Sequence, residues 1–188
     1  MTGRRTADAR ATPDPDLRIP FSDGCIRPWR KDDVDALVRH ADDREVWRNL
    51  GDRFPHPYTR AHARRWLGGE YASGSELALA IELRGEAGGG LGIKFWGDPI
   101  FRGTAELGYW LGRAWWGRGI MPRALEAVVP WAFEKFELVR IEAGVFDRNA
   151  ASARVLEKAG FHLEARLERS VIKEGQLLDR LLYVRFRD

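Results

Sequence analysis

The stretch "WWGRGIMPRAL", residues 115–125, constrains the fold more than any other part of the sequence. Gly117 and Gly119 directly follow two tryptophans, and Pro122 opens a run of residues with helical spacing. Proline suits the first turn of a helix, because the N–H that it lacks would have no partner there. Glycine removes side chains ahead of a helix N-terminus, whose free N–H groups and dipole attract anions. The stretch therefore predicts a strand-to-helix turn that either cradles a phosphate or uses glycine for geometry alone.

The segments on either side of this stretch predict one mixed α/β domain. Hydrophobic alternation and turn residues predict strands at 24–30, 76–83, 91–97, 104–112, 139–147, 161–173 and 177–187. Helical spacing and capping residues predict helices at 31–41, 42–51, 60–72, 121–136 and 149–160. The glycine-rich segment 84–90 is expected to be the turn of a hairpin. Residues 1–18 show no periodicity and predict a flexible tail, so the domain is expected to cover residues 19–188.

Composition argues against several classes of protein. No apolar run approaches the roughly 20 residues that a membrane helix needs, so no membrane association is expected. The single Cys25 permits no internal disulfide, which fits a reducing cytoplasm. The four histidines do not have the spacing of metal ligands, so no metal is expected. The net charge of +3 comes from arginines that alternate with acids, which favours a mixed-charge surface over a nucleic-acid interface.

Two longer segments carry a family resemblance. "AELGYWLGRAWWGRGIMPRAL" followed by "VFDRNAASARVLEKAGF" resembles the GNAT acyl-CoA N-acyltransferases, and most closely their RimJ/RimL-like branch, which acetylates ribosomal-protein N-termini. That branch shows a Gly-Tyr-Trp strand, then Trp-Gly-Lys-Gly, then Asn-x-x-Ser before Lys-x-Gly-Phe. The corresponding segments here are residues 108–110, 116–119, 149–152 and 158–161, and the resemblance covers about residues 24–186.

The resemblance implies the GNAT fold, with a mixed, strongly twisted sheet of about seven strands and helices on both faces. In that fold the fourth and fifth strands splay apart and acyl-CoA lies in the gap. Acetyl-CoA is thus the implied cosubstrate, with pantetheine along the fourth strand and pyrophosphate on the amides of the glycine motif. The cofactor-binding residues implied in this way are Trp110, Leu111, Gly112, Trp116, Gly117, Arg118, Gly119, Ile120, Met121 and Asn149.

The sequence departs from the family pattern at two positions. Met121 stands where the glycine motif usually ends in Gly or Ala, so its side chain must point away from the phosphates. Leu156 stands where many members carry a tyrosine that protonates the leaving thiolate. The resemblance implies that Ser152, one helical turn earlier, donates to the CoA sulfur instead. The alternative, if the resemblance is set aside, is that Ser152 is an ordinary helix residue.

The implied reaction needs a proton acceptor, because an amine attacks a thioester only as the free base. An α-amino group has a pKa of about 7.7–8.0, and a lysine one of about 10.4. Glu106 is the candidate base, because it precedes the pantetheine segment on the strand that should line the cleft. Its alternative role is that of a solvent-facing carboxylate. Phe54, Tyr58 and Trp96 are candidates for an acceptor pocket, and core packing is the alternative for each.

Together these features predict an N-acetyltransferase whose acceptor is a primary amine, either a protein N-terminus or a small molecule. Three alternatives stay open: transfer of a larger acyl group such as succinyl, an acyl-CoA sensor without turnover, and a nucleic-acid-binding protein. The last lacks interleaved aromatic and basic residues. The oligomeric state stays open between a monomer and a homodimer.

Overall fold

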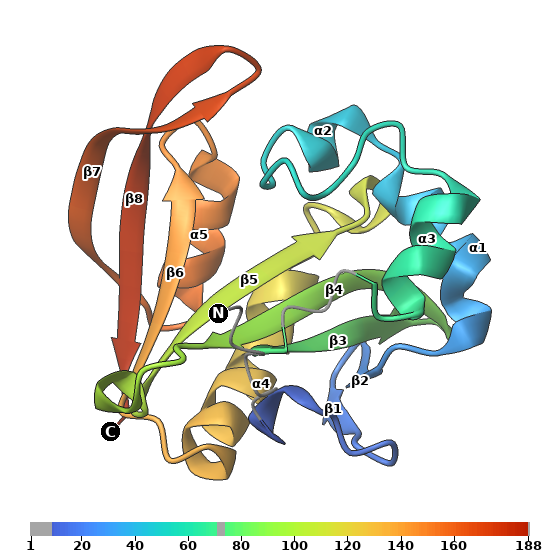
Figure 1. The fold of residues 1–188 in the computed structure, drawn as a ribbon, viewed down its shortest axis with the longest axis horizontal. Coiled ribbons are helices and arrows are strands. Elements are labelled where there is room, and N and C mark those ends of the chain that lie inside the picture. Colours follow the sequence, from blue (N-terminus) through green and yellow to red (C-terminus); the bar gives the residue numbers. More distant parts are fainter. Residues whose placement is uncertain (1–8, 71–73, 188) are drawn as a thin grey trace, which may run out of the picture.

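The computed structural model describes residues 9–70 and 74–187, which form one eight-stranded sheet with helices on both faces (Figure 1). The strand order is β1-β2-β3-β4-β5-β6-β8-β7. The strands are β1 (Ile19–Phe21), β2 (Gly24–Pro28), β3 (Glu76–Leu83), β4 (Glu86–Phe95), β5 (Thr104–Leu111), β6 (Arg140–Phe146), β7 (His162–Lys173) and β8 (Gln176–Phe186). The helices are α1 (Val34–Ala41), α2 (Arg44–Trp47), α3 (Arg60–Leu67), α4 (Ile120–Lys135) and α5 (Ala150–Lys158). Short 3₁₀ turns are η1 (Ala9–Ala11), η2 (Lys31–Asp33), η3 (Pro99–Phe101) and η4 (Arg113–Trp115).

The sheet opens between β5 and β6, the only parallel pair among the described strands. These two strands pair only over Thr104–Glu106 and Arg140–Glu142. Beyond that point they diverge, and each leaves an unpaired edge facing the other (Figure 1). This arrangement confirms the expected mixed sheet with a gap between the strands predicted at 104–112 and 139–147.

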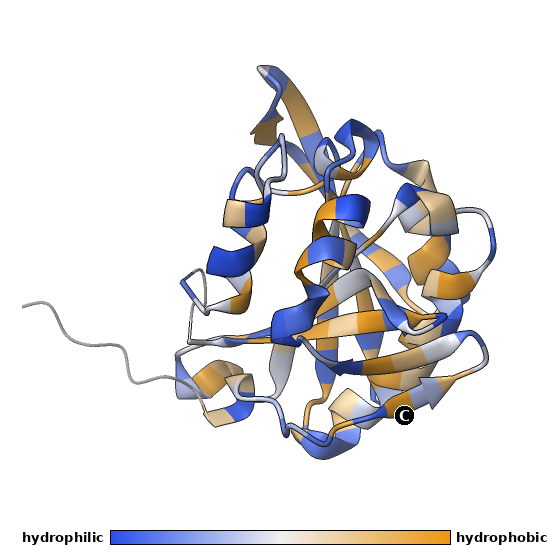
Figure 2. Cartoon of the chain, turned by 90° about the vertical axis from the view of Figure 1, so that its right-hand side faces the viewer, coloured by the Kyte–Doolittle hydropathy of each residue, from blue (hydrophilic) through white to orange (hydrophobic). Residues whose placement is uncertain are grey.

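Each face of the sheet has its own hydrophobic core. Helices α4 and α5 cover one face, where Leu125, Val128 and Leu156 are buried against the strands. Helices α1 and α3 cover the other face with a smaller cluster that contains Leu37 and Tyr58. Hydrophobic colouring follows the central strands and the inner sides of the helices (Figure 2). The sheet thus separates two hydrophobic clusters, one on each face.

Side-chain caps start two of the helices, and one of these helices lies at the gap. The Thr59 hydroxyl accepts a hydrogen bond from the N–H of His62 and starts α3, as its sequence context predicts. The Asn149 side chain accepts from the N–H of Ser152 at 3.2 Å and starts α5. The second cap fixes Ser152 in the first turn of a helix that begins directly beyond β6.

Several predicted boundaries change. Gly88, Gly89 and Gly90 belong to β4 rather than to the hairpin turn, which is formed around Arg84 and Gly85. A Cβ on Gly88 would lie 2.8 Å from Trp115 Nε1, so this glycine makes room for an indole rather than for a turn. Helix α2 is shorter than predicted, and β1 adds a strand to the expected seven. Residues 71–72, the predicted end of α3, lie outside the described residues, as does the first part of the predicted tail.

Candidate functional site

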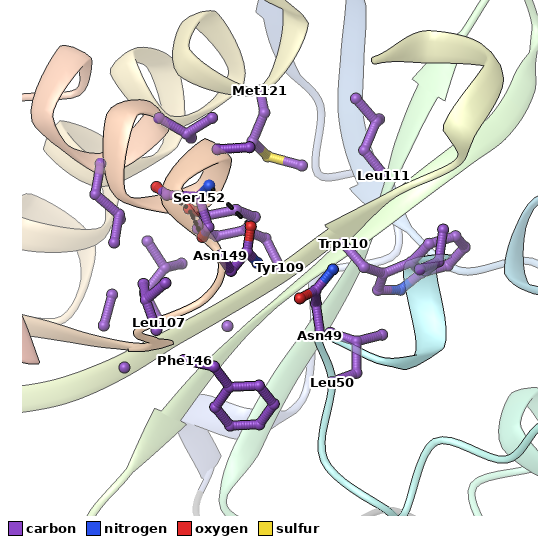
Figure 3. Close-up of a pocket in the computed structure, with 18 of the residues that line it drawn as sticks. Asn49, Leu50, Leu107, Tyr109, Trp110, Leu111, Met121, Phe146, Asn149 and Ser152 are labelled. Carbon is purple, nitrogen blue, oxygen red and sulfur yellow. Dashed lines mark hydrogen bonds between the residues drawn. The ribbon is translucent and has the colours of Figure 1, made fainter. Parts of the chain in front are cut away.

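A cavity of about 750 Å³ occupies the gap between β5 and β6 (Figure 3). Its walls come from both splayed strands, the start of α4, the first turns of α5, the loop after α2 and the β7–β8 hairpin. Two elements that are far apart in sequence, α5 and the loop around Asn49 and Leu50, therefore face each other across β5.

Strand β5 sends alternate side chains to the two faces of the sheet. Tyr109 points toward α5, whereas Trp110 points toward the cluster around α1 and α3 (Figure 3). The backbone N–H and C=O groups of β5 also face its two neighbouring strands alternately. The N–H of Gly112 donates to the Gly88 carbonyl at 2.9 Å, so the backbone groups of every second residue counted back from Gly112 bond to β4. The N–H groups of Tyr109 and Leu111, which lie beyond the paired residues of β5 and β6, consequently face the gap. The strand edge is thus available to pair with an extended ligand.

The glycine motif forms a turn at one end of this edge. Gly117 and Gly119 adopt left-handed φ values of 73° and 69°, a region that favours glycine. Helix α4 then begins without any side-chain cap, which leaves its first N–H groups open to an anion. Met121 belongs to the core cluster at 5% exposure and also lines the cavity. The departure at Met121 therefore adds no side-chain cap to the helix N-terminus.

Two hydroxyl groups meet inside the cavity. Ser152 Oγ lies 2.8 Å from the Tyr109 hydroxyl oxygen, and either group can be the donor (Figure 3). The Tyr109 hydroxyl also donates to the Ser152 carbonyl at 3.3 Å. Burial raises the pKa of Tyr109 well above its usual value. Tyr109 is therefore a neutral phenol at physiological pH and keeps a proton to donate.

Glu106 lies at the point where the strands separate. Its Oε1 accepts a hydrogen bond from Arg180 Nη2 at 2.6 Å, and its Oε2 lies 3.8 Å from Lys94 Nζ. The Arg180 side chain crosses β6 over Gly144, where a Cβ would come within 2.1 Å of Arg180 Nε. The carboxylate thus lines the cavity, and it is held between Lys94 of the adjacent strand β4 and Arg180, which reaches it from β8 across β6.

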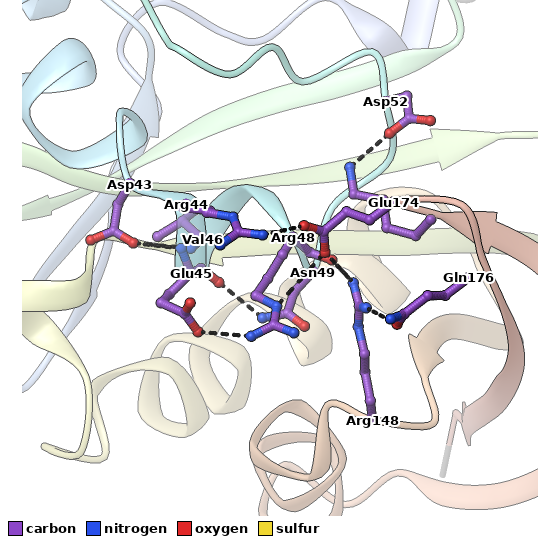
Figure 4. Close-up of polar contacts among 11 residues, drawn as sticks. Asp43, Arg44, Glu45, Val46, Arg48, Asn49, Asp52, Arg148, Glu174 and Gln176 are labelled. Atoms are coloured by element: carbon purple, nitrogen blue, oxygen red, sulfur yellow. Dashed lines mark hydrogen bonds and ion pairs between the residues drawn. The ribbon is translucent and has the colours of Figure 1, made fainter.

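Ion pairs close one side of the cavity by joining the β7–β8 turn to α2 (Figure 4). Glu174 accepts from Arg44 at 2.9 Å and from Arg148 at 3.4 Å, and the hydrogen bond from Arg44 is the main reason why the pKa of Glu174 is lowered. Lys173 is buried, donates to Asp52 Oδ1 at 2.7 Å and lies 3.7 Å from the centroid of the Trp47 ring. These contacts hold the two sides of the splayed sheet together.

A second cavity of about 490 Å³ opens on the α1 and α3 side of the sheet. It shares five lining residues with the first cavity, namely Leu50, Gly51, Gly108, Tyr109 and Trp110. A Cβ on Gly108 would have no neighbour within 4 Å, so this position is an opening between the two spaces. The second cavity can therefore hold part of a molecule that reaches into the gap.

Most of the residues that the sequence singled out lie at these cavities. Glu106, Ser152, Asn149 and all the predicted cofactor residues except Gly112 and Arg118 line the first cavity, and Phe54 and Tyr58 line the second. The N–H of Gly112 is used by β4, and Arg118 is exposed with its guanidinium 5.4 Å from the Trp115 ring centroid. Trp96 lines neither cavity and instead contacts Phe101, with ring centroids 6.3 Å apart.

Sequence reasoning missed Tyr109 as a functional group. The alternation of β5 could have indicated it, since a residue between Gly108 and Trp110 must point to the opposite face of the sheet. It also missed Arg180, which comes from a strand distant in sequence.

Among the described residues no group of three or more His, Cys, Asp or Glu side chains could hold a metal ion. None of the helices in the described part of the chain is long and apolar enough to span a membrane.

Comparisons with known proteins agree with this geometry. A family model described as an acetyltransferase (GNAT) domain matches residues 25–162. The Probable N-acetyltransferase YjcK of Bacillus subtilis is 52% identical over 79 residues, which are 40% of this chain and 44% of that protein. The Ribosomal-protein-serine acetyltransferase of Escherichia coli is 34% identical over 91 residues, 48% of this chain and 50% of that protein. The chain thus spans half or less of the length of these curated relatives.

Among solved structures, Mycobacterium smegmatis RimJ in complex with CoA-disulfide aligns with a TM-score of 0.78 at 29% identity. The alignment covers 92% of this chain and 88% of that protein. The similarity therefore extends over most of the chain.

Proposed function

Because the chain belongs to the GNAT acetyltransferase family, we propose that it transfers an acetyl group from acetyl-CoA to a primary amine by direct attack of the amine on the thioester. The observation that carries this proposal is the single cavity that joins the open edge of β5 to the uncapped start of α4. A strand edge and a helix N-terminus are what a ligand with an amide-containing arm and a pyrophosphate requires.

In the proposed complex the pyrophosphate accepts hydrogen bonds from the N–H groups of residues 117–121, at the left-handed turn. The pantetheine arm pairs with the gap-facing groups of Tyr109 and Leu111. The Leu111 carbonyl already accepts from Trp116 Nε1 at 2.7 Å, so the Leu111 N–H is the free group of that residue. Asn149 caps α5 and lines the same cavity. An N–H on this edge also stabilises the oxyanion of the tetrahedral intermediate.

Glu106 is the proposed proton acceptor, directly or through water. It stands where β5 and β6 separate, and its side chain lines the first cavity. Arg180 and Lys94 fix the carboxylate, and an incoming amine competes with them for its oxygens. To act as proton acceptor, Glu106 must release one of these two cations and form a hydrogen bond to the amine or to a bridging water instead.

Ser152 is the proposed donor to the departing sulfur, and Tyr109 positions it. When the neutral Tyr109 phenol donates to Ser152 Oγ, the serine hydroxyl proton is free to point at the sulfur. Leu156 is fully buried in the core, so it takes no part in this proton transfer. The pair of hydroxyl groups replaces the tyrosine that many family members carry at that place.

Replacing Ser152 with alanine is expected to lower kcat by roughly 10²-fold and to change KM for acetyl-CoA by a smaller factor, because a donor to the sulfur acts mainly in the transition state. Tyr109→Phe should cost about fivefold in kcat, equivalent to one hydrogen bond of about 1 kcal/mol. The measurement is steady-state kinetics, with Ser170→Ala on the exposed face of β7 as the control. A loss for Ser152→Ala that lies entirely in KM would make Ser152 a binding contact only.

The acceptor is proposed to be a protein N-terminus or a small-molecule amine. The name of the Escherichia coli relative, which specifies a ribosomal-protein serine, favours the N-terminus. The single cysteine favours a cytoplasmic location. Neither a metal nor a nucleic acid enters the proposed reaction, and both a monomer and a homodimer are compatible with it.

A screen of amines with purified protein and acetyl-CoA tests the proposal, with the free CoA thiol as the readout. Peptides with free N-termini and small amines are the two arms, and succinyl-CoA is the comparison for acyl-chain length. Turnover that depends on both substrates supports the transferase. Binding of acetyl-CoA with no thiol release from any amine would instead support the sensor without turnover.

A further inference from the structure

The second cavity contains a carboxylate that the described structure leaves unpaired. Glu76, on β3, is partly buried and has no hydrogen bond or ion pair with any described residue. By contrast, Glu106 is bound by Arg180, and Glu70, which lines the same cavity, is bound by Arg65 at 2.6 Å. The Glu76 carboxylate lies directly over Gly92, where a Cβ would be 2.2 Å from Oε1. Lys94 is the cross-strand neighbour of Glu76 on β4, but its ammonium group lies 3.8 Å from Glu106, and no cation of the described residues forms an ion pair with the Glu76 carboxylate.

Aromatic rings line the same cavity as this charge. The rings that line the same cavity are those of Trp29, Phe54, Tyr58, Trp66 and Trp110. Trp29 is stacked on Trp110 with centroids 6.5 Å apart, and Phe54 meets Trp110 at 5.6 Å. Ring faces attract cations, and more strongly when water is excluded. The cavity thus combines an unpaired carboxylate with the ring surfaces that suit an ammonium or guanidinium group.

The position of this cavity links it to the reaction. It meets the gap at Gly108, the open position on β5, and Glu106 lies two residues before it on the same face of the strand. A molecule with one end at Glu106 can therefore extend past Gly108 toward Glu76. Arg53 also lines the cavity, but its side chain is exposed, and solvent screens its charge at the entrance.

We infer that the acceptor carries a second cationic group besides the amine that is acetylated, and that Glu76 and the surrounding rings bind it. This inference rests on the proposed acetyl transfer. The shared chemistry is an ammonium or guanidinium group, which a diamine or a peptide with a basic side chain near its N-terminus can supply. An acceptor with only the reacting amine leaves Glu76 unpaired in the complex.

Paired acceptors test the inference with the wild-type protein. The pairs are n-butylamine with 1,4-diaminobutane, and Ser-Ala amide with Ser-Lys amide, each assayed at saturating acetyl-CoA. The second cation should raise kcat/KM by at least about tenfold in one pair, after the diamine rate is halved for its two equivalent amines. The pair that shows the gain identifies the source of the cation. Equal kcat/KM values within both pairs would overturn the inference and leave the proposed transfer intact.

The variant Glu76→Gln assigns the effect to this carboxylate. The substitution keeps the shape of the side chain, so kcat/KM for the dicationic acceptor should fall to nearly that of its monocationic partner, with KM for acetyl-CoA unchanged. Glu134→Gln, on the exposed side of α4, is the matched control and should keep the full preference. Equal losses for both acceptors of a pair would contradict the assignment.

Calorimetric titration with 1,4-diaminobutane gives a readout that does not need turnover. Wild-type protein should bind the diamine more tightly than n-butylamine, and Glu76→Gln should remove the difference. If no amine is acetylated but this difference is found, the cation site stands and the transferase proposal fails. If no difference is found, the site is rejected whatever the activity.

Discussion

Replacing Glu106 with glutamine is expected to lower kcat/KM by roughly 10²–10⁴ at a pH where the acceptor amine is mostly protonated, the usual contribution of a general base. Glutamine keeps the shape of the side chain and its contact with Arg180 but cannot accept the proton. Raising the pH should recover much of the loss, because free amine and hydroxide replace the missing base. The measurement is kcat/KM against pH for both proteins, with folding checked by circular dichroism.

Glu142→Gln is the matched control for this experiment. Glu142 lies directly beside Glu106 in the parallel pairing of β5 and β6, but it binds Arg140 at 2.7 Å and does not line the gap. Its substitution should leave the pH profile unchanged. Parallel profiles for wild type and Glu106→Gln, offset by less than about threefold, would remove Glu106 from the mechanism and make its pair with Arg180 purely structural.

Replacing Gly119 with valine is expected to weaken CoA binding by tenfold or more, equivalent to about 1.4 kcal/mol or more. The left-handed backbone at Gly119 disfavours a β-branched residue, and the new Cβ would lie 2.7 Å from Arg123 Nη1. That arginine binds Asp23 at 2.6 Å and the Arg118 carbonyl at 2.8 Å, so displacing it also disturbs the turn. Calorimetry with CoA is the measurement.

Gly85→Val separates the effect of backbone strain from that of the phosphate turn. Gly85 also has a left-handed φ, of 85°, but it lies in the β3–β4 turn with nothing within 4 Å of a new Cβ. This variant should lose some stability and keep its affinity for CoA. An unchanged affinity in a folded Gly119→Val protein would reject the phosphate-binding turn.

Local signals were sufficient for the parts of the site that a few neighbouring residues determine. The glycine turn, the start of α4 near Pro122 and the Asn149 cap each depend on backbone preferences that one or two residues set. The gap itself followed from the family resemblance and not from periodicity. It arises because β5 and β6 pair over only three residues.

Contacts between distant segments explain what the sequence could not show. Tyr109 meets Ser152 from 43 positions away, and Glu106 meets Arg180 from 74 positions away, so no local pattern encodes either pair. The glycines of β4 were misread for the same reason. A Cβ on Gly90 would lie 2.9 Å from Trp29 and 2.8 Å from Trp110, so packing between strands and rings, not turn geometry, requires glycine there.

The most direct test of the central claim is a crystal structure of the protein with CoA. The pyrophosphate oxygens should accept hydrogen bonds from N–H groups of residues 117–121, the pantetheine arm should lie along the β5 edge, and the sulfur should lie within hydrogen-bonding distance of Ser152 Oγ. Density for CoA outside the gap between β5 and β6, or a pyrophosphate group away from the glycine turn, would contradict the account.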